Sequence, residues 1–173
     1  MPYGKLTSDF FARPCPEAAR ELVGKLLCRR FPDGTVKKLR VTETEAYCGE
    51  DDTACHAHKG RTPRTETLYA APGTLYVYLC YGIHWMLNIV TGREGEPQAI
   101  LVRAAESAAG PGRLTKALSI DGSFNRSSLE ELSDSLWLED DGFPCSVETG
   151  KRIGIGYASK EDQEKPWRFI LVK

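Results

Sequence analysis

Three β-rich segments follow one another with very little chain between them, and this spacing limits the fold more than any other feature. They cover residues 74–81, 84–91 and 98–105; the first two meet near Gly82 and the last two are joined by the turn GREGEP. Parallel neighbours need a crossover of about a dozen residues or more, whereas antiparallel neighbours need only a hairpin turn. The sequence therefore predicts a three-stranded antiparallel meander.

The rest of the chain adds strands and a few separate helices. The other expected elements are, in chain order, a helix near 16–27, a hairpin at Asp33-Gly34 whose second strand is 36–47, a short helix at 113–120, and strands near 152–157 and 167–172. Consecutive strands with helices set apart are typical of an α+β fold with a largely antiparallel sheet. With 173 residues, no internal repeat and no linker, we expect one domain over residues 1–173.

Composition excludes several classes of protein. The chain is 41% hydrophobic and 27% charged, as in globular proteins, and no apolar run approaches the roughly 18 residues of a membrane span. The N-terminus resembles no secretory signal. The six cysteines form no CxxC pair, so we interpret them as reduced thiols of an intracellular protein.

The net charge of −1 argues against a nucleic-acid-binding protein, but the charges are unevenly distributed. Residues 127–150 hold seven of the 24 acidic residues and no Lys or Arg, so 23 basic and 17 acidic residues remain elsewhere. This distribution is compatible with one DNA-facing basic surface, and equally with a solvated acidic loop.

The segment ETEAY carries the first candidate site. Strand alternation places Glu43, Glu45 and Tyr47 on one face. A partly buried glutamate with a like charge nearby has a raised pKa and can act as a general base. The alternative is an exposed polar strand face.

Cys55, His56 and His58 could ligate zinc, although their spacing matches no common zinc motif and no fourth ligand is evident. The basic run that follows, residues 59–64, suits either a loop that contacts phosphate or a solvated turn.

Several polar residues interrupt apolar strands. Tyr81 precedes a glycine at a hairpin tip, where its ring suits a wedge between base pairs or a simple turn residue. His84, Asn88 and Arg103 also stand in otherwise apolar strands. Asn88 and Arg103 need partners if they are buried, so each of these two is a satisfied structural group or part of a site.

Taken together, six ordered blocks resemble the alkyladenine (3-methyladenine) DNA glycosylase family. The blocks are VTETEAYCGEDDTACHAHKGRTPR, PGTLYVYLCYGIHWMLNIV, ILVRAAE, GPGRLTKALSI, GKRIGIGYA and KPWRFIL. The resemblance implies a curved, mostly antiparallel sheet with flanking helices and a protruding β-hairpin that enters DNA. It also implies hydrolysis of the N-glycosidic bond of damaged purines (3-methyladenine, 7-methylguanine, hypoxanthine, ethenoadenine) after the nucleotide is flipped out of the duplex.

The resemblance assigns a role to each matching residue. Glu45 matches the general base that activates water, Arg103 the arginine that holds this carboxylate, and Ile153 a position whose backbone carbonyl touches the water. The residues that match those around the flipped base are Tyr47, His56, Tyr78 and Asn88.

In the DNA interface, Tyr81 matches the intercalating tyrosine, and Arg64 and Arg113 match basic positions near the backbone. The resemblance implies no metal and no cofactor, a monomer, and a partner that is double-stranded DNA containing damaged purines. We expect no membrane association and, by default, the bacterial cytoplasm.

Three alternatives remain open from the sequence. The chain could be a noncatalytic module that binds damaged DNA, or a zinc-dependent or small-molecule hydrolase. It could also be a bifunctional glycosylase and lyase, if the secondary amine of Pro2 formed a Schiff base with the sugar.

Overall fold

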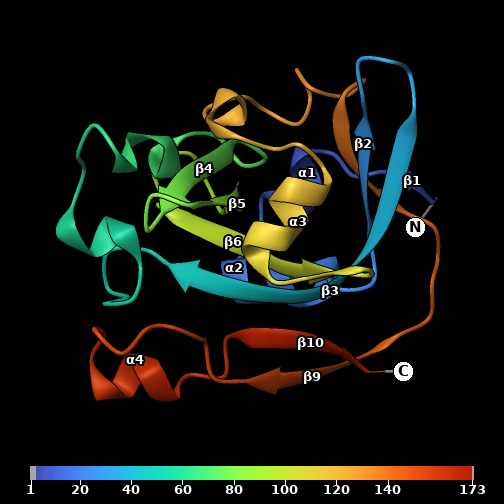
Figure 1. Cartoon of the computed structure of the whole chain (residues 1–173). Helices are drawn as coiled ribbons and strands as arrows, with labels where there is room; N and C mark the ends of the chain where they lie inside the picture. Colours follow the sequence, from blue (N-terminus) through green and yellow to red (C-terminus); the bar gives the residue numbers. More distant parts are fainter. Residues whose placement is uncertain (1–2, 173) are drawn as a thin grey trace.

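The expected meander forms the centre of the structure, a computed structural model that describes residues 3–172. Strands β4 (Leu75–Cys80), β5 (His84–Thr91) and β6 (Gln98–Ala105) pair antiparallel in sequence order (Figure 1). The remaining strands are β1 (Gly4–Lys5), β2 (Leu26–Arg30), β3 (Val36–Cys48), β7 (Ala108–Ala109), β8 (Leu136–Asp140), β9 (Ser146–Gly150) and β10 (Arg168–Val172). The helices are α1 (Ser8–Phe11), α2 (Cys15–Leu22), α3 (Pro111–Ala117) and α4 (Lys160–Glu164), with 3-10 turns η1 (His56–Lys59), η2 (Thr65–Tyr69) and η3 (Gly122–Phe124).

One open sheet connects the strands in the order β1-β8-β2-β3-β6-β5-β4, and every strand pairing between residues 3 and 172 is antiparallel. Strand β3 is the longest of these strands: its first part pairs with β2 and its second part with β6 and β10. The register shifts between Val41 and Thr44, and such a bulge bends the strand. The expected α+β fold with a mostly antiparallel sheet is therefore confirmed.

The helices cover the sheet and close its core. Helix α2 packs on β3 and β6, and α3 packs on β5 and β6 (Figure 1). The largest side chains that are fully buried in this core include Phe11, Leu22, Leu27, Ile89, Ile100 and Leu114. The β9–β10 hairpin lies along β3, so the last part of the chain covers the strand that carries ETEAY.

Two expected elements differ from the structure. The helix near 16–27 ends at Leu22, because Val23 is extended and Gly24 adopts φ +93°; residues 26–30 form a strand instead. No strand forms at 152–157, because Gly154 adopts φ +74° and interrupts the apolar alternation; the strand in this region is β9. The short helix expected at 113–120 lies at 111–117.

The acidic segment 127–150 lies against basic residues of β3 and against Lys25, which immediately precedes β2. Its carboxylates pair with lysine and arginine side chains at Lys25–Asp140, Lys38–Glu139 and Arg40–Asp141. These contacts neutralise charge at the end of β3 that is remote from Glu45.

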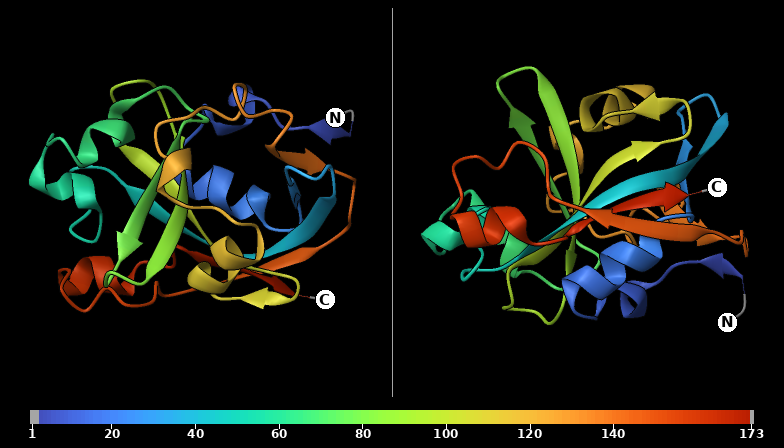
Figure 2. Two further views of the ribbon diagram at one scale, coloured as in Figure 1. Left: turned by 45° about the horizontal axis from the view of Figure 1, so that its top comes forward. Right: turned by 90° about the horizontal axis from the view of Figure 1, so that it is seen from below.

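The β4–β5 hairpin projects from the body of the molecule (Figure 2). None of the helices within residues 3–172 has the length and apolar character needed to cross a membrane. All six cysteines, each inside the described range, are free thiols.

Candidate active site

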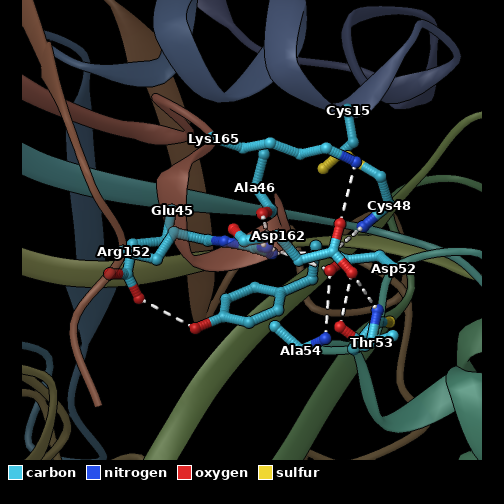
Figure 3. A network of polar contacts seen from close by, with 12 residues as sticks. Cys15, Glu45, Ala46, Cys48, Asp52, Thr53, Ala54, Arg152, Asp162 and Lys165 are labelled. Carbon is cyan, nitrogen blue, oxygen red and sulfur yellow. Dashed lines mark hydrogen bonds and ion pairs between the residues drawn. The ribbon is translucent and has the colours of Figure 1, made fainter. Parts of the chain in front are cut away.

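Glu45 is a carboxylate that the fold buries completely, with an exposed fraction of 0%. It lies in the second half of β3, where β6 pairs on one side and β10 on the other. Its Oε1 accepts a hydrogen bond from the Tyr47 hydroxyl at 3.0 Å and is 3.5 Å from Arg103 Nη1 (Figure 3 shows the surrounding network). The interpretation of an exposed polar strand face is therefore wrong.

Burial raises the pKa of Glu45 above that of a free glutamate, although Arg103, the Ile153 amide and the Tyr47 hydroxyl each act to lower it. A carboxylate with a raised pKa and fixed donors is suited to take up a proton. Among residues 3–172, Oε2 accepts one hydrogen bond, from the Ile153 amide at 2.6 Å. Because a carboxylate oxygen accepts two hydrogen bonds, this oxygen retains capacity for a water molecule.

Arg103 lies between two carboxylates. Its Nε is 3.3 Å from Glu43 Oε1, and Arg168 of β10 contacts the same oxygen at 3.0 Å. The shared contact with Arg103 places Glu43 and Glu45 on one side of β3, as strand alternation predicts. Arg103 is therefore close enough to Glu45 to act as the partner of its carboxylate.

Ile153 reaches Glu45 through a different atom from the one expected. The resemblance implied a carbonyl that contacts water, whereas the hydrogen bond in the structure comes from the Ile153 N–H. Ile153 lies in the loop between β9 and α4, 108 residues from Glu45 in sequence. Ile153 therefore lies at the Glu45 carboxylate, as expected. The contact between its carbonyl oxygen and water stays a prediction.

An aromatic pocket lies beside Tyr47. Its lining is Tyr47, Ala54, Cys55, His56, Leu68, Tyr76, Tyr78, Asn88, Ala99 and Tyr157. The ring centroids of His56 and Tyr78 are 4.7 Å apart, and those of Tyr76 and Tyr78 are 5.2 Å apart. All four residues expected around a flipped base therefore line one pocket, and Glu45 is buried behind its Tyr47 wall.

The His56 imidazole is uncharged at neutral pH, because its surroundings lower its pKa. Its Nδ1 is 2.8 Å from the Tyr76 hydroxyl. Burial, followed by the positive charges of Arg64 and Lys59, lowers the pKa of His56 to about 4. The pocket therefore presents a neutral imidazole, which does not repel a cationic ligand.

Asn88 is buried in the pocket wall with its amide oriented by the main chain. Its Nδ2 donates to the Tyr76 carbonyl oxygen at 3.1 Å. The sequence prediction missed Tyr76 and Tyr157 as pocket residues. Tyr76 is two residues before Tyr78 and therefore on the same face of the strand, and this spacing could have identified it. For Tyr157 the sequence offered no signal beyond its place in the GKRIGIGYA block.

The hairpin tip exposes apolar side chains. Tyr81 has an exposed fraction of 90% and adopts a left-handed backbone conformation with φ +52°, and Ile83 next to it is 71% exposed. An exposed ring on a strained backbone is more typical of a functional contact than of a core residue. Ile83 was not singled out from the sequence.

The two expected basic residues are both exposed and lie at different elements. Arg64 is exposed, and its guanidinium lies 5.3 Å from the centroid of the Tyr78 ring, at a groove that adjoins the aromatic pocket. Arg113 is exposed on α3, which packs against the hairpin strand β5.

The residues considered for zinc have other partners. His56 contacts Tyr76, whereas His58 Nδ1 is 2.8 Å from the Glu50 carbonyl oxygen. Within residues 3–172 no group of three His, Cys, Asp or Glu side chains is arranged to hold a metal ion. Pro2, considered for a lyase step, lies outside the described residues.

Known proteins are similar to this chain over nearly its whole length. A family model described as methylpurine-DNA glycosylase (MPG) matches residues 9–109 and 105–173. A protein from Psychrobacter cryohalolentis is 43% identical over 193 aligned positions, which cover 94% of this chain and 89% of the relative. One from Methanocella arvoryzae is 42% identical over 184 positions, covering 95% and 90%. Each bears the name "Putative 3-methyladenine DNA glycosylase". The chain belongs to the methylpurine-DNA glycosylase family.

Proposed function

We propose that the protein is a monofunctional DNA glycosylase that hydrolyses the N-glycosidic bond of alkylated and deaminated purines and so initiates base excision repair. The substrates are 3-methyladenine, 7-methylguanine, hypoxanthine and ethenoadenine in double-stranded DNA. The observation that carries the proposal is a buried carboxylate with a raised pKa, Glu45, directly behind a pocket of aromatic rings.

In the proposed reaction Glu45 takes a proton from water as the water oxygen bonds to C1′ and the bond from C1′ to the purine nitrogen breaks. The electron pair of that bond leaves with the base. The Tyr47 hydroxyl and the Ile153 amide hold the carboxylate, and Arg103 offsets its charge. For N3-methyladenine and N7-methylguanine, which are cationic in DNA, the base leaves neutral without further protonation. Hypoxanthine and ethenoadenine are neutral in DNA, so each takes up a proton from solvent water as it leaves.

The pocket supplies selectivity. Tyr47 stacks on one side of the flipped base, and His56 and Tyr78 lie on the other; electron-rich rings attract a cationic base by about 0.5–2 kcal/mol each. Because His56 is neutral, it adds no repulsion. Asn88 occupies the space that the 2-amino group of normal guanine would need.

The surface around the pocket holds the DNA. Tyr81, at the exposed tip of the projecting hairpin, fills the gap that the flipped nucleotide leaves in the stack. Arg64 and Arg113 contact backbone phosphates. Residues 1–173 act as one glycosylase domain and as a monomer, in the bacterial cytoplasm.

The direct test uses duplex oligonucleotides with a single hypoxanthine or ethenoadenine, alongside N7-methylguanine DNA, without added metal. We expect strand breaks only after alkali, because a monofunctional glycosylase leaves an intact abasic site. Breaks without alkali, together with borohydride trapping of a protein–DNA adduct, would indicate a lyase. Tight binding without base release from any lesion would indicate the noncatalytic module and overturn the proposal.

A further inference from the structure

Arg152 and Asp52 form a buried ion pair outside the residues assigned above (Figure 3). Arg152 Nη1 donates to Asp52 Oδ2 at 2.6 Å and Nη2 donates to Oδ1 at 2.9 Å, and the two side chains are 0% and 1% exposed. The same carboxylate accepts hydrogen bonds from the main-chain amides of Cys48 and Ala54. An ion pair that is buried and joined by two hydrogen bonds fixes the chain segments around Arg152 and around Asp52. Displacement of either residue would leave the other as an unpaired buried charge.

Arg152 also contacts the strand that bears Glu45. Its Nη1 donates to the Ala46 carbonyl oxygen at 3.0 Å, and its guanidinium lies 4.9 Å from the centroid of the Tyr47 ring. The Trp167 ring is at 5.0 Å. Arg152 does not line the aromatic pocket, so it supports Tyr47 from outside.

The 151–158 loop is fastened on both sides of the Ile153 amide, by the Arg152–Asp52 pair before it and by Tyr157 after it. Arg152 immediately precedes Ile153, whose N–H donates to Glu45. Farther along, the Tyr157 hydroxyl donates at 2.7 Å to the carbonyl oxygen of Ala54, the residue whose amide bonds Asp52. The loop is thus tied to the segment 49–55 before and after Ile153.

We propose that the Arg152–Asp52 pair is a positioning element of the hydrolytic centre: it holds the 151–158 loop so that the Ile153 amide stays on Glu45 and the Tyr47 ring keeps its place in the pocket. This inference rests on the proposed function, because Glu45 is the general base assigned there. Neither residue touches the reacting atoms.

The charged and titratable groups around Glu45 determine how the role can be detected. They are Arg103 from β6, Glu43 and Tyr47 from β3, Arg168 from β10 through Glu43, and Tyr157 from the loop. The Ile153 amide is one of the groups that lower the pKa of Glu45, and Ile153 directly follows Arg152 in the chain. Loss of this donor raises the pKa of Glu45, since the N–H favours the ionised carboxylate.

The electrostatic effect of the pair has the opposite sign. Removal of the Asp52 charge leaves Arg152 unneutralised near Glu45, and an uncompensated positive charge lowers the pKa of a carboxylate. The direction in which the pKa of Glu45 moves therefore distinguishes a positioning role of the pair from a through-space effect of its charge.

The test variant is Asp52→Asn, which keeps the shape of the side chain and removes its charge. The matched control is Asp141→Asn, because Asp141 accepts both Nη atoms of Arg40, at 3.0 and 2.8 Å, at the remote end of β3. Two quantities are measured: the single-turnover excision rate of hypoxanthine against pH, and the amide proton chemical shift of Ile153.

In Asp52→Asn we expect the acidic limb of the rate profile to move to higher pH by about one unit, the size of one lost hydrogen bond to a charged group. We also expect the Ile153 amide proton to move upfield, because a short bond to a carboxylate deshields it. Asp141→Asn changes neither quantity. An unchanged Ile153 resonance, or an acidic limb that stays or moves to lower pH, overturns the inference.

A second variant covers the case in which Asp52→Asn does not fold. Arg152→Lys keeps the charge but loses the two-point contact, so the same two shifts are expected in the same directions. The amide measurement needs no activity. If the wild-type protein released no base from any lesion, the proposed function would fail, while an unmoved Ile153 resonance in the variants would separately overturn the positioning role.

Discussion

The Tyr47 hydroxyl lies 3.0 Å from Glu45 Oε1, so one strand supplies both an aromatic wall of the pocket and a hydrogen-bond donor to the carboxylate behind it. Stacking and carboxylate chemistry are therefore coupled through a single side chain. Substitutions of that side chain separate the two contributions.

Tyr47→Phe keeps the ring and removes the donor. The lost hydrogen bond raises the pKa of Glu45 further, because the hydroxyl favours the ionised form. Since the proposed base is the ionised carboxylate of Glu45, we expect the acidic limb of the excision rate to move to higher pH, with affinity for lesion DNA within about threefold of wild type. Tyr47→Leu, which lacks the ring, should weaken binding as well. An unchanged pH profile in Tyr47→Phe would contradict the coupling.

Glu45→Gln should remove excision, by about 10²–10⁴-fold, the usual contribution of a general base. It should also stabilise the fold at neutral pH. Burial raises the pKa of Glu45 in the folded state above its unfolded value, so ionisation destabilises the protein as pH rises through the unfolded pKa. Calorimetry should give a higher Tm for Glu45→Gln at pH 7 and a smaller difference near pH 4. A lower Tm at pH 7 would contradict this account.

His56 should titrate far below an ordinary histidine. In the folded protein its pKa is lowered to about 4, from about 6.5 in the unfolded chain. As pH falls from about 6.5 to 4, the unfolded chain takes up a proton at this position and the folded protein does not, so stability is lost in that window. NMR titration gives the midpoint directly. His56→Gln should lose less stability than wild type over the same interval, measured by urea unfolding.

Tyr81→Ala should leave the Tm unchanged, because the ring is 90% exposed and fills no core. Affinity for lesion-containing duplex should fall, since the vacated position in the base stack is no longer filled. Fluorescence anisotropy with matched lesion-containing and undamaged duplexes separates binding at the lesion from nonspecific binding to the duplex. Equal affinity of wild type and Tyr81→Ala for lesion DNA would exclude insertion of this side chain.

The elements that were predictable from the sequence are those set by local pattern. The meander follows from short connections, and the common side of Glu43 and Glu45 follows from strand alternation. The end of α2 at Leu22 was missed because Leu26 and Leu27 continue an apolar pattern that suits a helix as well as a strand. The strand expected at 152–157 is absent for another reason, because Gly154 adopts φ +74° and interrupts the alternation.

The pocket rings of His56 and Tyr78 were identified by resemblance, because strand alternation places Tyr47 beside Glu45 but brings no other ring to it. The Arg152–Asp52 pair had no sequence signal. Its partners are 100 residues apart, and an arginine and an aspartate at that separation are indistinguishable from surface charges. Their importance appears only when the β9–α4 loop is seen against the segment after β3.

The 108-residue separation between Glu45 and the Ile153 amide also bears on protein synthesis. The N-terminal part of a chain leaves the ribosome first and can begin to fold there. A nascent chain that has reached residue 120 already contains Glu45, His56, Tyr78 and the hairpin tip, but it lacks the donor to Oε2 and the Tyr157 edge of the pocket. The surroundings of Glu45 are therefore completed late in translation, after the residues that we propose contact DNA have been made.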